Sequence, residues 1–265
     1  MDPFIEFKNA QRQGWSHFAP LELQTTPPAA QLVRHARVSA GQRVLDVGCG
    51  TGVVAITAAL RGATVDGLDL TPVLLERARA NARTAAVDVS WHEGDVEQLP
   101  FPDATFDAVL SQFGHMFAPR PDVAVAEMLR VLRPGGTIAF NTWPPELFVG
   151  RMFMLTGKYS PPPPPGAQPP PLWGDPTVIR QRLGSAVQAI SFHRADMRVP
   201  ALSAKHHREI MEQTAGPVIR MIETLGTADP GRLAEFRSEY EALVTEYLED
   251  NVVCQGYLLT RATKV

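Results

Sequence analysis

Between residues 42 and 143, short β-branched apolar runs alternate with longer segments in which apolar residues recur every three or four positions. The short runs predict strands and the longer segments predict helices, and this alternation is typical of βαβ units around a parallel sheet. The predicted strands lie in "RVLDV", "ATVDGLDL", "VDVSWHEG", "FDAVLSQF" and "TIAFNTW". The pattern therefore predicts a doubly wound α/β sheet with helices on both faces.

The pattern changes after Trp143, where proline becomes frequent. Of the 24 prolines in the chain, 11 lie between Pro144 and Pro176. Proline has no amide hydrogen and fixes φ, so this segment cannot form a regular helix or a central strand. It can be a stiff lid or connecting loop over the sheet edge, a disordered linker, or a polyproline ligand for another domain. We favour the lid, because a capped helix is predicted to begin directly afterwards at Asp175-Pro176.

The remaining chain returns to regular patterns. "AVQAISFHRADMRV" predicts a strand, residues 203–225 are predicted to be helical with a break at Gly216-Pro217, and "GRLAEFRSEYEALVTEYLED" has apolar residues at helical spacing. The final "VVCQGYLLTRATK" predicts an antiparallel strand at or near the sheet edge. We therefore expect a seven-stranded, mostly parallel sheet with a lid or cap region inserted after the fifth strand.

Composition excludes several classes of protein. The net charge of −3 and a pI near 6.2 provide no basic field for nucleic acid. Two cysteines, Cys49 and Cys254, are too few for a disulfide framework or a cysteine-built zinc site, so we expect no metal and a reducing, cytoplasmic setting. No segment approaches the roughly 20 apolar residues of a membrane span. We expect a protein without nucleic-acid or membrane partners.

The segment "VLDVGCGTG" places Gly48, Gly50 and Gly52 between the first predicted strand and the following helix. Residues without a Cβ allow a tight turn and let a ligand lie against backbone amides at the helix N-terminus. A dinucleotide site would read G-x-G-x-x-G, but Val53 occupies the place of its third glycine. A nicotinamide oxidoreductase is therefore disfavoured.

Four segments, "VLDVGCGTG", "VDGLDLT", "EGDVEQLPFPDATFDAVLSQ" and "EMLRVLRPGGTIAF", follow one another from Arg43 to Phe140. In order and spacing they resemble the class I, Rossmann-like S-adenosylmethionine methyltransferases, and among these the ubiquinone and menaquinone C-methyltransferase-like group. The resemblance implies S-adenosylmethionine as donor and S-adenosylhomocysteine as product. It also implies an N-terminal helical segment covering the cofactor (1–41), a cofactor-binding core (42–143), a lid and acceptor region (144–250) and a last core strand (251–265).

The resemblance implies roles for three acids, of which Asp46 and Asp69 end the first and second predicted strands and Asp95 comes after the third. Asp46 would orient the methionyl end of the cofactor, Asp69 would accept hydrogen bonds from both ribose hydroxyls, and Asp95 would accept one from the adenine amine. An acid at a strand end can also be solvated or cap a helix, and glycine loops occur in other doubly wound proteins. The other residues of the implied cofactor site are Gly48, Cys49, Gly50, Gly52, Leu70, Val96 and Ser111.

The acceptor is expected beyond the carboxyl end of the fourth strand. The "SQFG" sequence there lacks the Asn/Asp-Pro-Pro motif of enzymes that methylate base or amide nitrogens, which argues against such acceptors. Methyl transfer requires no dedicated catalytic residue, since the donor is already activated. If the acceptor must lose a proton, His115 is the candidate base, with a half-buried loop histidine as the alternative. Candidate acceptor-binding residues, which can equally be lid packing, are Trp15, His17, Gln112, Phe113 and Trp173.

The sequence thus predicts a methyltransferase that acts on an oxygen, nitrogen or carbon atom of a small apolar or aromatic metabolite. The alternative is a catalytically inactive S-adenosylmethionine-binding sensor or partner protein, with the proline run as its docking strand. Both need the same cofactor residues, so the motifs do not separate the two hypotheses.

Overall fold

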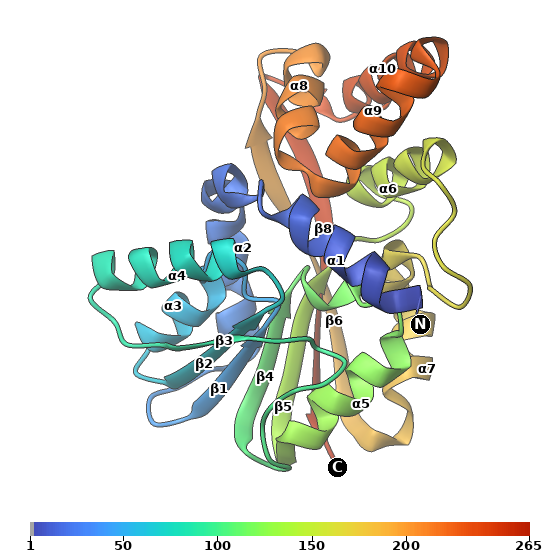
Figure 1. The fold of residues 1–265 in the computed structure, drawn as a ribbon. Coiled ribbons are helices and arrows are strands. Elements are labelled where there is room, and N and C mark those ends of the chain that lie inside the picture. The colour runs from blue at the N-terminus through green and yellow to red at the C-terminus, as the bar shows by residue number, and fades with distance from the viewer. Residues whose placement is uncertain (1–2) are drawn as a thin grey trace.

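A single large sheet runs through the computed structural model, which describes residues 3–265 (Figure 1). Residues 1 and 2 of the expected N-terminal segment lie outside the described residues. The strand order is β3-β2-β1-β4-β5-β8-β6, and β8 is antiparallel to both of its neighbours. The seven-stranded, mostly parallel sheet predicted from the sequence is confirmed. The strands are β1 Arg43–Val47, β2 Thr64–Asp69, β3 Ser90–Glu93, β4 Phe106–Gln112, β5 Leu132–Thr142, β6 Val187–Pro200 and β8 Val252–Lys264, with a short β7, Leu248–Glu249, paired to β8.

Helices connect the strands and also form a separate group after β6. None of the helices in residues 3–265 is long and apolar enough to cross a membrane. The α-helices are α1 Pro3–Trp15, α2 Glu22–His35, α3 Val53–Ala59, α4 Pro72–Thr84, α5 Pro121–Val131, α6 Phe148–Tyr159, α7 Pro176–Leu183, α8 Ala204–Thr214, α9 Gly216–Ala228 and α10 Pro230–Thr245. Short 3₁₀ helices are η1 Ala19–Leu21, η2 His115–Phe117, η3 Pro170–Gly174 and η4 Gly184–Ala186.

Both faces of the central strands β1 and β4 are buried, as expected for parallel strands. Successive side chains of a strand point to opposite faces, so Val44 and Leu45 of β1 enter different clusters of the core. Val44 belongs to the cluster that contains Leu32 of α2 and Ala55 of α3. Leu45 belongs to the larger cluster, which includes Met128 of α5. This two-sided packing fixes the strand ends at which the loops of interest begin.

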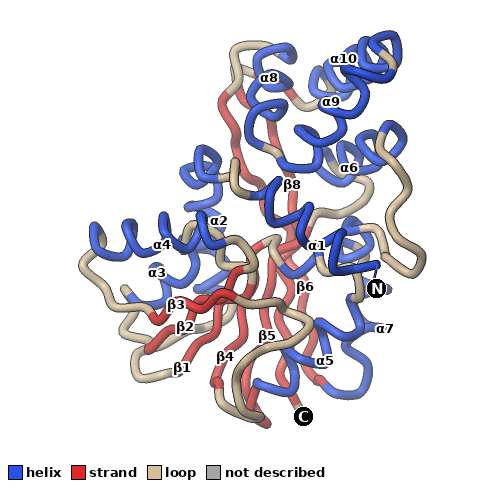
Figure 2. Tube along the Cα trace, viewed as in Figure 1, coloured by secondary structure: helices blue, strands red, loops and turns tan. Residues whose placement is uncertain are grey.

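The last two long strands extend beyond the rest of the sheet. β5 pairs only with residues 258–263 of β8, whereas β6 pairs with β8 from Val252 to Lys264. The outer half of this pair is a two-stranded ribbon, which rises from the sheet beside α8 in Figure 2. Helices α8, α9 and α10 lie between the two strands in sequence and pack on one another and on α6. The ribbon therefore carries a helical cap above the carboxyl ends of the parallel strands.

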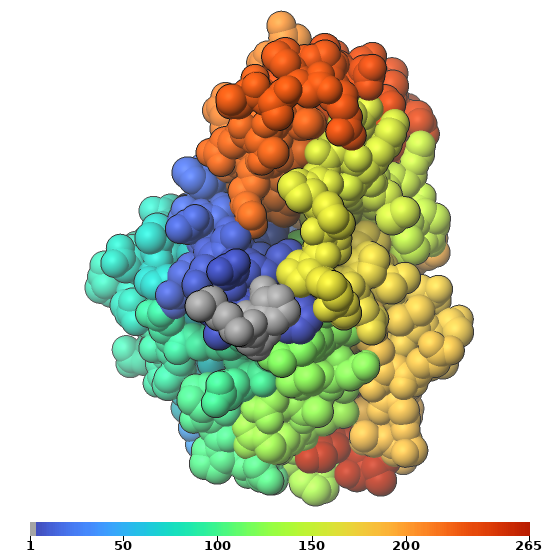
Figure 3. Space-filling model, turned by 45° about the vertical axis from the view of Figure 1, so that its right-hand side comes forward, coloured from blue at the N-terminus to red at the C-terminus, as the bar shows by residue number. Residues whose placement is uncertain are grey.

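The proline-rich segment connects α6 to η3. The Gln168 amide donates to Pro119 O at 3.3 Å, just after η2, and the helix that follows is capped by Asp175, which accepts from the Thr177 amide at 2.7 Å. In Figure 3 this segment, in yellow, lies beside the blue N-terminal helix. A Cβ on Gly166 would come 3.9 Å from the ring of Phe4 in α1. The prolines thus run along the surface next to α1.

Candidate active site

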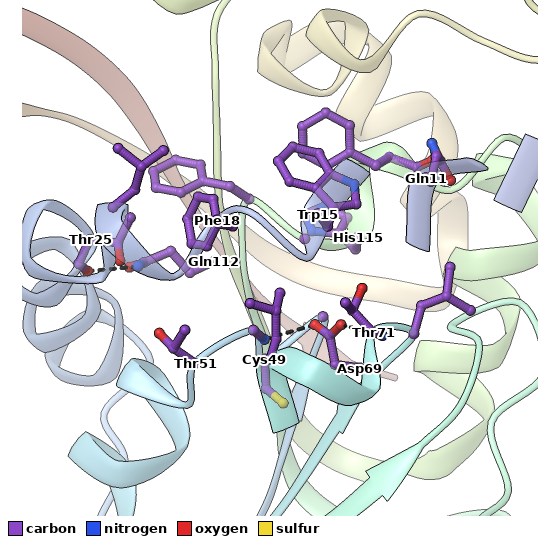
Figure 4. A pocket seen from close by; sticks show the side chains of 18 of the residues that line it. Gln11, Trp15, Phe18, Thr25, Cys49, Thr51, Asp69, Thr71, Gln112 and His115 are labelled. Atoms are coloured by element: carbon purple, nitrogen blue, oxygen red, sulfur yellow. Dashed lines mark hydrogen bonds between the residues drawn. The ribbon is translucent and has the colours of Figure 1, made fainter. Parts of the chain in front are cut away.

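A pocket enclosing about 220 Å³ lies at the carboxyl ends of β1, β2 and β4. The strand order reverses between β1 and β4, which is where doubly wound sheets bind ligands. Figure 4 shows Cys49 and Asp69 on one side of it and Trp15 and Phe18 of the N-terminal segment on the other. The predicted site residues that line the pocket are Trp15, Asp46, Gly48, Cys49, Gly50, Asp69, Leu70, Asp95, Val96, Gln112, Phe113 and His115.

Two walls of this pocket differ in character. We call the lining residues of 46–54, 68–74 and 94–96, together with Lys8, the cofactor wall. We call the lining residues of 15–25, 112–119, 143–156, 197–218 and Gln255 the acceptor wall. The cofactor wall comes from loops that follow strands, whereas the acceptor wall joins the N-terminal segment to the helical cap.

The glycines of the first loop have different tasks. Gly50 has φ of +53°, and a Cβ placed there would meet no atom within 4 Å, so the pocket is open at this residue. Gly52 has φ of +85° and does not line the pocket, because a Cβ there would lie 2.6 Å from the ring of Trp91. Gly50 thus leaves room for a ligand, whereas Gly52 allows the loop to pack against β3.

Two buried acids lie beneath this loop. Asp69 accepts hydrogen bonds from the amides of Gly50 and Thr71, both at 2.8 Å, which ties the end of β2 to the glycine loop. Asp46 accepts one from the Ala55 amide at 3.0 Å through Oδ2, while its buried Oδ1 has no partner among the described residues. Burial raises the pKa of both carboxyls, that of Asp46 well above its usual range. An unpaired buried carboxylate oxygen favours a cationic or hydrogen-bond-donating ligand.

The third acid, Asp95, has a partner that the sequence did not reveal. Lys8 of α1 places its Nζ 2.5 Å from Asp95 Oδ2 and 2.5 Å from Glu97 Oε2. Arg12, one helical turn later, donates through Nε to the Leu70 carbonyl at 2.7 Å and pairs with Glu93. A signal did exist, since two cations four positions apart share one helix face.

The other end of α1 is fixed by close backbone packing. A Cβ on Gly216, the first residue of α9, would lie 2.6 Å from the Gly14 carbonyl carbon. Contact this close requires glycine at the crossing point. Helix α1 therefore joins the cofactor wall, through Lys8 and Arg12, to the helical cap.

His115 lies in η2, immediately beyond β4. Its side chain is buried, both ring nitrogens lack a hydrogen-bond partner among the described residues, and burial, together with the charge of Arg182, lowers its pKa to about 3. Ser111 positions it, because Ser111 Oγ donates to Val47 O at 2.6 Å and accepts from the His115 amide at 3.1 Å. The imidazole is therefore neutral at pH 7, and the residue lines the pocket while both of its ring nitrogens stay buried without a partner among the described residues.

Four predicted site residues do not line the pocket: Gly52, Ser111, His17 and Trp173. His17 is exposed in the turn after α1. Trp173 is buried behind His115, with ring centroids 4.5 Å apart, and Arg182 covers its far face. Trp173 thus supports the His115 ring from behind.

Gln112 and Phe113 both line the pocket, but Gln112 forms hydrogen bonds to its neighbours whereas Phe113 stacks on another ring. Gln112 donates to Thr25 O at 2.8 Å and accepts from Asn141 at 3.2 Å, so its amide mainly joins α2 to the sheet. Phe113 has φ of +61°, which is rare for a bulky residue, and its ring stacks on Trp143 at 3.9 Å. The unusual backbone holds a flat aromatic surface at the pocket.

The acceptor wall contains no Asp, Glu, Lys or Arg among the described lining residues. All four residues of those types that line the pocket, Lys8, Asp46, Asp69 and Asp95, belong to the cofactor wall. The sequence analysis missed several acceptor-wall residues because they come from the cap, far away in sequence. Examples are Met152 of α6, Met197 of β6, Met211 of α8 and Gln255 of β8.

Comparisons with known proteins agree with this geometry. A family model described as a methyltransferase domain matches residues 45–140, which hold the glycine loop and all three acids. The chain contains a methyltransferase domain, and it is an S-adenosylmethionine-dependent methyltransferase with the class I fold. The structure of a putative methyltransferase from Bacillus halodurans has the same fold, with a TM-score of 0.63 at 21% identity, covering 89% of this chain and 98% of that one.

Relatives of this methyltransferase extend over different parts of the chain. An uncharacterised protein of Mycobacterium tuberculosis is 36% identical over 257 residues, which is 96% of this chain and 93% of its own. A demethylmenaquinone methyltransferase of Deinococcus radiodurans is 40% identical over 119 residues, covering only 44% of this chain and 48% of its own. The long relatives therefore share the cap region, whereas the quinone enzyme matches over less than half of either chain.

The pocket fits the cofactor of this methyltransferase, S-adenosylmethionine. The unpartnered Oδ1 of Asp46 can receive the methionyl ammonium, and the open space at Gly50 gives access to the loop backbone. Cys49 fits a packing role, because burial raises the pKa of its thiol well above its usual range and keeps it protonated. The methionyl role of Asp46, the ribose role of Asp69, the adenine role of Asp95 and the cofactor contacts of Leu70 and Val96 stay predictions.

Proposed function

We propose that this methyltransferase transfers the methyl group to an oxygen, nitrogen or carbon atom of a small, uncharged, apolar or aromatic metabolite. One observation carries the proposal: the acceptor wall has no charged side chain among its described residues, and Phe113, Trp143, Phe153 and three methionines contribute to it. A carboxylate, phosphate or ammonium group on the acceptor would lose its hydration there without gaining a partner, at a cost of several kcal/mol (about 2–7 for a polar group, more for a charge). An uncharged acceptor has no such penalty.

The residues of the two walls divide the work. S-adenosylmethionine, when bound, supplies an activated methyl group. Asp46 and Asp69 would hold it, and Lys8 and Arg12 fix α1 over its site and keep water away. In the acceptor wall, His115 contributes a neutral imidazole whose two nitrogens are buried without a partner among the described residues. With a pKa near 3, His115 carries no charge at pH 7, and its buried ring helps to shape the acceptor wall.

The proposal is tested in two steps, of which the first is calorimetric titration with S-adenosylmethionine and S-adenosylhomocysteine, with NADH as control. We expect micromolar binding of both sulfur ligands and none of NADH. The second step measures transfer of a tritiated methyl group to 1-naphthol, 1-naphthylamine and a naphthohydroquinone, with 1-naphthoate and 1-naphthyl phosphate as matched charged controls. We expect kcat/KM at least tenfold higher for the uncharged compounds.

Two results would contradict the proposal in different ways. Equal methylation of the charged and uncharged naphthalenes would refute the assignment of the acceptor class. Tight binding of S-adenosylmethionine with no methyl transfer to any compound would favour the alternative, an inactive cofactor-binding sensor or partner protein.

A further inference from the structure

A chain of buried polar side chains begins at the acceptor wall and runs through the cap. Gln255 of the β6–β8 ribbon lines the pocket, and its Nε2 lies 3.3 Å from His207 Nε2 of α8. The other ring nitrogen of His207, Nδ1, lies 3.3 Å from Tyr240 Oη of α10. Tyr240 in turn donates to Met152 Sδ of α6 at 3.4 Å, and Met152 also lines the pocket. Four elements that are distant in sequence thus meet in one hydrogen-bonded chain.

The chemistry of the groups fixes which atom donates and which accepts in each of these hydrogen bonds. An amide nitrogen can only donate, so His207 Nε2 must accept from Gln255. Burial, with the neighbouring His206, lowers the pKa of His207 to about 4, so the ring is neutral and carries its one proton on Nδ1. Nδ1 then donates to Tyr240 Oη, and the Tyr240 hydroxyl donates to the sulfur of Met152. Each contact of the network thus joins one donor to one acceptor.

With the hydrogen bonds in this direction, one polar atom of the network, Gln255 Oε1, has no hydrogen-bond partner among the described residues. Gln255 is 6% exposed and lines the pocket, and its Oε1 makes no hydrogen bond to any described residue. Residues 253, 255 and 257 point to the same side of β8, and Val253 and Tyr257 are buried in the same core. The Gln255 side chain thus lies between buried neighbours on this face of β8 and lines the pocket.

We propose that Gln255 Oε1 recognises a hydroxyl or N–H group of the acceptor, and that His207, held by Tyr240, is the positioning residue that fixes the orientation of this amide. The inference rests on the proposed function in so far as the pocket holds the methyl acceptor. It narrows the acceptor class to apolar or aromatic molecules that carry a hydrogen-bond donor. With the amide turned round, the pocket would instead present an N–H group and select carbonyl or ether oxygens.

The test compares probes that differ in one group. Equilibrium dialysis, with and without S-adenosylhomocysteine, gives Kd for 1-naphthol, for 1-methylnaphthalene of similar shape but without a donor, and for 1-methoxynaphthalene, whose oxygen only accepts. We expect 1-naphthol to bind at least fivefold more tightly than 1-methylnaphthalene. We expect 1-methoxynaphthalene to show no advantage over 1-methylnaphthalene.

Three variants test which residues cause the preference for 1-naphthol over 1-methylnaphthalene. Gln255→Met keeps the length of the side chain and removes the amide, so the naphthol preference should fall to less than twofold. His207→Phe should also lower the preference for 1-naphthol to less than twofold, while the Kd for 1-methylnaphthalene changes less than twofold. If His207 only supported the fold, its loss would not affect the two ligands differently. His207→Gln, whose amide oxygen can accept the same proton, should restore at least half of the preference.

Each outcome is decisive. No preference in the unaltered protein, no binding of any naphthalene, a preference for 1-methoxynaphthalene, or a naphthol preference that survives in Gln255→Met would each overturn the proposal. If His207→Phe does not fold, Gln255→Met alone carries the test. If the unaltered protein does not bind S-adenosylhomocysteine, the proposed function is refuted instead. The dialysis without S-adenosylhomocysteine then still measures the preference for 1-naphthol over 1-methylnaphthalene.

Discussion

The two walls of the pocket are built by opposite means. The cofactor wall uses carboxylates whose partners are mostly backbone amides of neighbouring loops, as with Asp69 and the amides of Gly50 and Thr71. The acceptor wall uses neutral side chains from the end of β4, η2 and the loop after β5, and also from the N-terminal segment, α6, β6, α8, α9 and β8. The difference teaches that donor binding depends on local sequence, whereas acceptor selection depends on how distant elements pack.

The largest effect is expected from acidification, which should lower the free energy of unfolding through two buried histidines in and behind the acceptor wall. His115 in the acceptor wall and His207 behind it have pKa values of about 3 and 4, below the value near 6.5 of an unfolded histidine. Because the unfolded chain binds protons more readily, their stabilising contribution is complete above pH 6.5 and is lost as the pH falls towards 4. The loss is about 1.4 kcal/mol per pH unit for each histidine. Urea unfolding at pH 7.5, 6.0 and 5.0 measures it.

His207→Phe is the matched variant for this measurement. It should retain only the part of the pH dependence that comes from His115 and other groups. Replacement of His17, exposed in the turn after α1, by Gln is the control and should leave the pH dependence unchanged. Equal slopes in all three proteins would show that His207 does not contribute to acid stability.

The second effect tests the cofactor wall through Asp69→Ala. The substitution removes two backbone contacts of the glycine loop as well as the predicted ribose contact, so S-adenosylhomocysteine should bind at least tenfold more weakly, a loss of about 1.4 kcal/mol or more. Calorimetric titration gives the affinity. Asp103→Ala, at an exposed acid away from the pocket, is the control. An unchanged affinity in Asp69→Ala would disprove the assignment.

A charge introduced into the acceptor wall should weaken binding of the acceptor but not of the cofactor. In Met211→Glu the new carboxylate faces an uncharged pocket, so 1-methylnaphthalene should bind roughly tenfold more weakly because bringing it close would desolvate the charge. S-adenosylhomocysteine should keep its affinity within twofold, and Met211→Leu should leave both ligands within twofold. If both ligands weakened equally in Met211→Glu, the two walls would not be independent.

The smallest effect concerns Asp46, where binding and stability are expected to oppose each other. Burial and the neighbouring charge of Asp69 raise the pKa of Asp46, so the ionised form destabilises the ligand-free protein at neutral pH. Asp46→Asn should therefore raise the free energy of unfolding by about 1 kcal/mol, while S-adenosylhomocysteine binds at least threefold more weakly. Urea unfolding and titration of the same sample decide it. A variant that is less stable but binds normally would rule out this trade-off.

The sequence predicted the cofactor wall well because its signals are local. Asp46 and Asp69 lie at the carboxyl ends of β1 and β2, and the glycines and Asp95 come soon after a strand, so a correct strand assignment already places them at one edge of the sheet. The pairing of Lys8 with Asp95 spans 87 residues and leaves no local trace beyond a shared helix face with Arg12. Such a contact is decided by tertiary packing.

The acceptor wall was harder to predict for the same reason. Trp173 was expected to contact the acceptor, but it packs behind His115, because η3 folds under η2. Gln255 lies in a strand whose alternation predicts burial and says nothing of His207, 48 residues away. The strand "VVCQGYLLTRATK" was expected in the sheet, yet its first half leaves the sheet within the ribbon.

That ribbon makes the cap an exchangeable module. Pro200 and Val252 are paired at its end, so residues 201–251 leave the fold and return to it at neighbouring points. An evolving gene can replace such an insertion while the strands that carry it, and the donor site below, keep their register. Descendants of one ancestral enzyme could thereby acquire new acceptors by exchanging α8, α9 and α10, with the donor chemistry inherited intact.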